Sequence, residues 1–250
     1  MTTQAEIRRW LSPLLASRSD VIFRERSLWL KPAAHVCRSI FFEGSSDRTD
    51  PRPRWYFTLP FTPFGLPPKI WSAQIMVGRS TDTDFAQRVF GEFTDAIDNC
   101  LKPISSIEAF YQMTLEDQRI ATGAGWWQLS KYPPYHACVL AALGRLGEAL
   151  RVAEAHTAQI PQWEKALGDA EAISTLGPNG SGTKSAANYA RRGLSPLLEL
   201  QRLVVLARVG DRQGVASLLH EWERRKVRRW EIEDIWESTP FPVELDAGAA

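Results

Sequence analysis

The hydrophobic pattern begins as helical and then changes to short extended runs. Residues 3–17 carry apolar side chains at helical spacing, which predicts an amphipathic helix capped by Thr3. Short runs rich in aromatic and β-branched residues follow, and clusters of Pro, Gly and Ser separate them. We expect an antiparallel meander of four or five strands, namely Val21–Arg24, Ser27–Lys31, Val36–Phe42, Trp55–Leu59 and Ile70–Val77.

From Asp82 onward the apolar period is helical again. A helix capped by Asp82 or Thr83 is expected to run to Leu101, with Pro103 ending it. Ser105 or Ser106 begins another helix through Tyr111. Two helical hairpins are then predicted, with turns at Gly144–Gly147 and at Gly210–Asp211, and an irregular stretch at 174–185 lies between them. The helices of these hairpins are expected at His136–Leu143, Glu148–Gln159, Pro196–Val209 and Arg212–Arg225.

This order of elements predicts an α+β fold. A small antiparallel sheet with flanking helices is followed by a C-terminal array that resembles helical repeats. We divide the chain near residue 120, into an α+β domain at 1–120 and a helical hairpin domain at 121–250.

Composition narrows the function classes. The chain has 30 Lys plus Arg against 29 Asp plus Glu, a net charge of +1, so it lacks the sustained positive field that nucleic acid or an anionic membrane attracts. No apolar stretch is long enough for a membrane span. Three cysteines are too few for a disulfide framework, which favours a cytoplasmic protein. The ten Trp are the one compositional excess.

The segment Gly177–Ser185 looks like the phosphate-binding loop of ATPases. In such a loop Lys directly follows the last Gly, so that its ammonium reaches the phosphates. Here Thr183 intervenes before Lys184, and a helical pattern precedes the segment where a strand is required. We therefore expect a polar turn and no bound cofactor.

Two His-x-Cys pairs, His35 with Cys37 and His136 with Cys138, contain residue types that bind zinc. The first pair shares one face of a strand, whereas positions i and i+2 of a helix diverge, which separates the second pair. An enzyme or zinc protein that uses these residues between the two parts is the alternative function. Because no catalytic motif is present, we expect no catalytic or metal-binding residues.

The densest basic run is Arg224–Arg229. Acidic residues on both sides favour a helix C-terminus, where cations complement the exposed carbonyls, over a site for a polyanion. Trp222, Trp230 and Trp236 are spaced at close to helical intervals, and we interpret them as the seam that packs the last helix onto the hairpins.

The two hairpins resemble tetratricopeptide repeats over residues 134–226, because their offset of 66 residues is close to twice the repeat period. Gly144 takes the turn between the helices, Ala149 the small position of close approach and Pro161 the stop. The second hairpin keeps only Gly210 with Asp211. The resemblance implies a surface that binds another protein.

The N-terminal part is similar to small bacterial α+β domains of unknown function that are encoded near toxin and immunity genes. The resemblance is carried by the leading helix and by the strands from Phe23 to Leu30. It implies a non-enzymatic module that neutralises a toxin by covering it. The residues predicted to bind the partner are Arg52, Arg54, Trp55, Trp126, Trp127, Trp163, Trp222 and Arg225.

Overall fold

A computed structural model describes residues 2–64, 72–115, 129–175 and 181–245. It divides the chain into two compact units, each described here by itself. The first comprises Met1–Pro60, Leu66–Leu129 and Glu223–Thr239, and the second comprises Phe61–Gly65, Ser130–Trp222 and Pro240–Ala250. The division is therefore not a single cut near residue 120, because Glu223–Thr239 belongs to the unit that holds the sheet.

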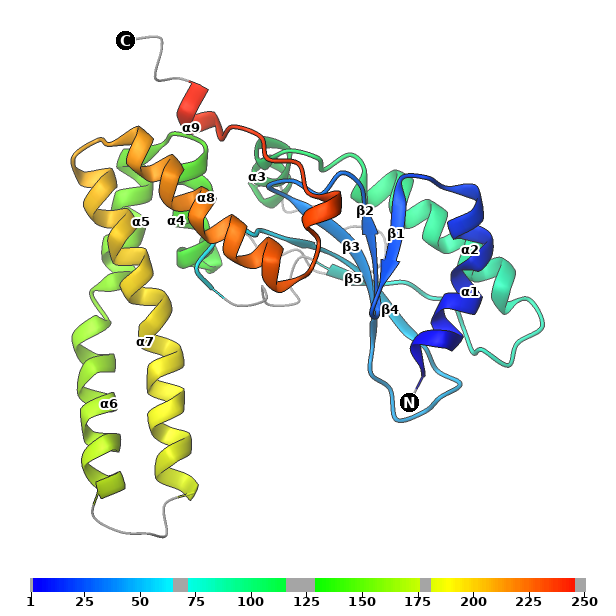
Figure 1. Cartoon of the computed structure of the whole chain (residues 1–250), viewed down its shortest axis with the longest axis horizontal. Helices are drawn as coiled ribbons and strands as arrows, with labels where there is room; N and C mark the ends of the chain where they lie inside the picture. The colour runs from blue at the N-terminus through cyan, green and yellow to red at the C-terminus, as the bar shows by residue number, and fades with distance from the viewer. Residues whose placement is uncertain (1, 65–71, 116–128, 176–180, 246–250) are drawn as a thin grey trace. The chain divides into compact units, whose positions relative to one another are not determined.

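The first unit is built on a five-stranded antiparallel sheet in the order β1-β2-β3-β4-β5 (Figure 1). The predicted meander is confirmed. Each strand pairs with its successor along the chain, since hairpin connections place consecutive strands side by side. The strands are β1 (Val21–Arg24), β2 (Ser27–Leu30), β3 (Cys37–Glu43), β4 (Arg52–Thr58) and β5 (Ser72–Gln74).

Helices cover the sheet face that carries Phe42. The indole of Trp10, on α1 (Gln4–Ser17), lies 6.4 Å from the Phe42 ring, and Phe93 of α2 (Phe85–Asp95) lies 5.6 Å from it. The predicted long helix to Leu101 is present, but its second part is a π-helix, η1 (Ala96–Leu101). Helix α3 (Ile107–Leu115) adds Phe110, which packs on Phe57 of β4.

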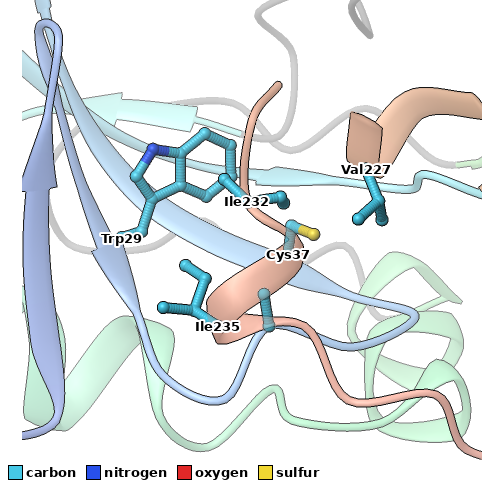
Figure 2. Packing of buried hydrophobic residues seen from close by; sticks show 6 residues of the cluster. Trp29, Cys37, Val227, Ile232 and Ile235 are labelled. Carbon is cyan, nitrogen blue, oxygen red and sulfur yellow. The ribbon is translucent and has the colours of Figure 1, made fainter. Parts of the chain in front are cut away.

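The opposite face of the sheet is covered by the C-terminal part of the same unit. Side chains of Trp29 and Cys37 pack with Val227, Ile232 and Ile235, which come from the end of α8 (Arg212–Arg229) and from the 3₁₀ turn η3 (Glu233–Ile235) (Figure 2). Backbone hydrogen bonds fix this contact. The Ala33 amide donates to the Ile235 carbonyl at 2.8 Å, and the Glu237 amide donates to the Ala33 carbonyl at 2.8 Å.

Four charged side chains join the end of α1 to η1 and the residue that follows it. Arg18 pairs with Asp20 and Asp98 at 2.8 Å, and Lys102 pairs with the same two carboxylates at 3.0 Å. Hydrogen bonds from Arg18 and then from Lys102 lower the pKa of Asp98 to about 2, and those from Arg18 hold the pKa of Asp20 well below its usual range. The cluster is stabilising because its charges compensate one another.

The depressed pKa of Asp98 predicts how this cluster responds to acid. Its contribution is present above the pKa of an unfolded Asp, about 4, and is lost as the pH falls towards 2. We expect Asp98→Asn to destabilise the fold at pH 7 by less than about 1 kcal/mol, measured as a lower melting temperature, and to have no effect below pH 2. Thermal unfolding across this range measures the difference, with Glu92→Gln on the exposed side of α2 as the control. An Asp98→Asn deficit that does not change with pH would contradict this assignment.

The second unit is helical and contains both predicted hairpins. Gly144 and Gly210 take positive φ angles of 76° and 69° at the two turns, a conformation that glycine adopts without strain. Helix α7 packs against α5 and α6 (Figure 1). The elements are the 3₁₀ turn η2 (Leu129–Lys131) at the junction of the two units, α4 (Pro133–Ala142), α5 (Leu146–Thr157), α6 (Ile160–Thr175), α7 (Ser181–Arg208), the first part of α8 and α9 (Pro242–Leu245).

Helix α7 is longer than the sequence pattern indicates. It begins at Ser181 and contains Pro196, so the predicted irregular stretch is wrong for 181–185, and α6 continues to Thr175. Residues 176–180 of the loop-like segment lie outside the described residues. The segment follows helix α6, whereas a phosphate-binding loop follows a β-strand.

Trp163 of α6 lies directly over Gly193 of α7. A Cβ atom added at Gly193 would lie 2.4 Å from a carbon of the indole ring, so only glycine permits this approach. The indole also packs on Tyr189 at 5.6 Å between ring centroids. Burial of Ile160 and Leu194 nearby continues the same contact between α6 and α7.

Gly193→Ala is therefore expected to destabilise the second unit. The methyl group displaces Trp163, and we expect a net loss of about 1–2 kcal/mol despite the better helix propensity of Ala. Gly168→Ala on α6 is the matched control, because a Cβ there meets no atom within 4 Å. It should stabilise by about 0.5–1 kcal/mol. Urea unfolding of both variants measures the difference, and equal stabilisation would show that Trp163 does not depend on Gly193.

Candidate functional site: a buried histidine and two exposed helix faces

The least exposed histidine–carboxylate pair in the described residues lies in the first unit. His35 Nδ1 is 2.7 Å from Oε1 of Glu223, and His35 Nε2 is 3.0 Å from Oγ1 of Thr239. The exposed fractions of His35 and Glu223 are 7% and 1%. A carboxylate buried away from water needs a hydrogen-bonding partner such as the imidazole, because an unpaired buried charge is strongly unfavourable.

His35 lies in the connection between β2 and β3, whereas Glu223 lies on α8 and Thr239 ends the segment that returns to the sheet. The order hydroxyl, imidazole, carboxylate is also that of a hydrolase triad. The same bonds have a mechanical role, since they join three segments of the fold next to the Ala33–Ile235 backbone contact. The Trp236 ring packs edge-on against the imidazole at 6.5 Å.

The neighbouring Cys37 thiol is fully buried and donates to the Ala34 carbonyl at 3.5 Å. Burial, and then the negative charge of Glu223, raise the pKa of this thiol well above its ordinary value. A thiol in that state is a poor nucleophile and a poor metal ligand, because both roles require the thiolate.

Within the described ranges, no three His, Cys, Asp or Glu side chains are arranged to hold a metal ion. Both nitrogens of His35 already have hydrogen-bond partners. His136 lies on α4 of the second unit, and burial lowers the pKa of its imidazole. The described residues therefore contain no set of ligands for the zinc site of the alternative function.

The residues predicted on β4 have different environments. Arg52 is exposed and pairs with Asp50 at 2.8 Å. Arg54 is half-buried and donates to the Ser72 hydroxyl at 3.2 Å. Trp55 is 2% exposed and packs on Phe57, so it is a core residue and offers no surface to a partner.

The predicted partner-binding residues of the hairpins also differ in how far they are exposed. Trp163 is half-buried over Gly193, and Trp222 is 1% exposed, with its indole donating to Glu199 at 2.9 Å. Arg225 is exposed on α8. Trp126 and Trp127 lie outside the described residues. Burial thus removes Trp222, like Trp55, from the set of surface residues.

The expected tryptophan seam is only partly present. Trp222 belongs to the helical unit, as predicted. Trp230 and Trp236 follow the end of α8 and pack in the sheet unit, Trp230 against Trp29 at 6.1 Å. Because α8 ends at Arg229, helical spacing does not apply to these two residues.

One exposed apolar face was missed by sequence reasoning. Leu198 and Val205 of α7 are 43% and 57% exposed, and their spacing of seven residues places them on one face of the helix about 10 Å apart. Val209, in the turn directly after α7, is 75% exposed. We call these three residues the α7 stripe. The opposite side of the helix is buried at Leu197, Leu200, Leu203, Val204 and Ala207. Because α7 has apolar residues on both sides, the sequence pattern alone does not show which side is buried and which is exposed.

A second exposed face lies at the end of α8. Arg224, Arg228 and Arg229 are exposed there, and we call them the α8 arginine face. The α7 stripe and the α8 arginine face are the two candidate contact surfaces, one in each unit.

Comparison with known proteins adds no relative: no family model, no curated protein and no solved structure matches the chain. No helix in the described ranges combines the length and apolarity needed to cross a membrane.

The His35–Glu223 pair predicts a large effect of truncation. Glu223→Ala leaves the buried imidazole without its acid, and we expect a loss of about 3 kcal/mol in the free energy of unfolding. Thr239→Val removes one hydrogen bond and should cost about 1 kcal/mol. The exposed Glu237 provides the control, since Glu237→Ala should stay within about 0.5 kcal/mol of the parent. Urea denaturation measures all three, and an unaffected Glu223→Ala variant would contradict the structural role.

Proposed function

We propose that the protein is a non-enzymatic protein-binding module, of the immunity type, that neutralises a toxin by covering it. The observation that carries the proposal is the α7 stripe. Leu198 and Val205 share one exposed face of α7 and Val209 follows at the helix end, and an exposed apolar patch of this kind favours contact with another protein. A helix that is buried on its other side presents these side chains with little loss of entropy on binding.

The chemistry-bearing side chains support the same proposal. His35 and Glu223 bind each other inside the fold, and the pKa of the Cys37 thiol is raised by burial. The half-buried Cys100 thiol also has a raised pKa, because of burial and then the charge of Asp95. These groups are more suited to holding the fold than to reacting with a substrate.

Charged groups beside the α7 stripe suit a rim around an apolar centre. Arg202 of α7 pairs with Glu221 at 2.7 Å and with Glu199 at 2.8 Å, and Arg208 pairs with Glu154 at 2.7 Å. Paired charges at a rim contribute specificity and little attraction of their own, while the apolar centre supplies most of the binding free energy. The resemblance of the hairpins to tetratricopeptide repeats is consistent with this use of helix faces.

Co-expression with the product of the adjacent gene tests the proposal. We expect the protein to form a complex with that product and to relieve its toxicity. The variant with Leu198, Val205 and Val209 each changed to Asp should lose the complex, with affinity reduced at least about 100-fold by calorimetry, because three carboxylates cannot be desolvated at an apolar centre.

Met76→Asp is the control, since Met76 is 71% exposed and belongs to the first unit, whereas the α7 stripe belongs to the second. It should bind as tightly as the parent. Circular dichroism and thermal unfolding confirm that both variants fold. An unbound or unneutralised gene product, or full binding by the triple variant, would contradict the proposed function.

A further inference from the structure

The α8 arginine face is more positive than its sequence context indicates. Arg224, Arg228 and Arg229 form no ion pair with any residue in the described part of the chain. Arg228 and Arg229 lie in the last turn of α8, where they also complement the carbonyl groups of the helix end. Arg224 lies before the last turn, so the helix dipole does not account for it.

Acidic residues flank this run in the sequence, but the fold uses three of them elsewhere. Glu221 pairs with Arg202, and Glu223 is buried against His35. Asp234 pairs with Arg24, which also donates to the Glu231 carbonyl. The predicted helix C-terminus is confirmed, since α8 ends at Arg229, but these three carboxylates do not neutralise the exposed arginines.

The arginines project from a helix end that is held firmly on its other side. Val227 is 4% exposed in the cluster with Trp29 and Cys37. Lys226 lies over the Trp230 ring, with its ammonium 5.8 Å from the centroid, and donates to the Leu59 carbonyl at 3.4 Å. A fixed helix end orders the arginine backbones before a partner arrives, which reduces the entropy lost on binding.

We propose that the α8 arginine face binds an acidic segment of a protein partner, in which two or more carboxylates lie within about one helical turn of each other. The proposal rests on the function proposed above and names a second contact of the same module. Arginine binds carboxylates in a planar, two-pronged geometry, and the half-buried Trp230 and Trp236 nearby are residue types common at binding hot spots.

The extent of the face favours a protein over a nucleic acid. Residues 224–229 rise by only about 8 Å along α8, which matches a short acidic segment. The exposed carboxylates of Glu231 and Glu233 follow directly, and they would repel a phosphate backbone that continued past the helix end.

Fluorescence anisotropy with a labelled octaglutamate peptide, at low salt, tests this inference on the full chain. The parent should bind the peptide, and the Arg224→Glu/Arg228→Glu variant should bind at least about tenfold more weakly. Arg8→Glu/Arg9→Glu is the matched control, because both arginines are exposed on α1 and the change in net charge is the same. Octaglutamine controls for binding to the peptide backbone.

Equal binding by the parent and the α8 variant, or an equal loss in the α1 control, would overturn the inference. So would tighter binding of a short DNA strand than of octaglutamate through the same arginines, which would make the face a nucleic-acid site. The peptide assay does not involve the adjacent gene product, so it separates failure of this contact from failure of the proposed function. Thermal unfolding confirms that the variants are folded.

Discussion

The pairing of His35 with Glu223 is the interaction on which the arrangement of the first unit depends. The two residues are 188 positions apart, and both are nearly inaccessible to water. A buried carboxylate is tolerated only with a partner, so the pair fixes the end of α8 to the sheet. With the two segments held together, the apolar side chains around Trp29 and Ile235 pack against each other (Figure 2). Each buried side chain of this size contributes about 1.5–3 kcal/mol to the stability of the fold.

This constraint also explains where the polar chemistry of the chain is used. The imidazole, the carboxylate and the neighbouring Cys37 thiol hold segments together inside the unit. The surfaces that we propose for binding are the two helix faces, apolar on α7 and cationic on α8. An apolar centre and a separate charged contact are the two features that protein-binding surfaces combine, the first for affinity and the second for the rate and specificity of association.

The sequence predicts local structure well and long-range structure poorly. All five strands were expected, because aromatic and β-branched runs are a local signal. The glycine turns at Gly144 and Gly210 were expected for the same reason. The return of Glu223–Thr239 to the sheet was not, since Glu223 reads as one more surface charge beside a basic run. The burial of Trp55 and the exposure of Val209 depend equally on tertiary neighbours that no local pattern contains.

Hydroxyl-radical footprinting of the free chain and of its complex with the adjacent gene product tests the central claim most directly, because it measures the solvent exposure of individual side chains. We expect Leu198, Val205 and Val209 to be oxidised in the free chain and protected in the complex, while the buried Trp222 and Trp55 stay unreactive in both. Unchanged oxidation of the α7 stripe in a formed complex would contradict the account.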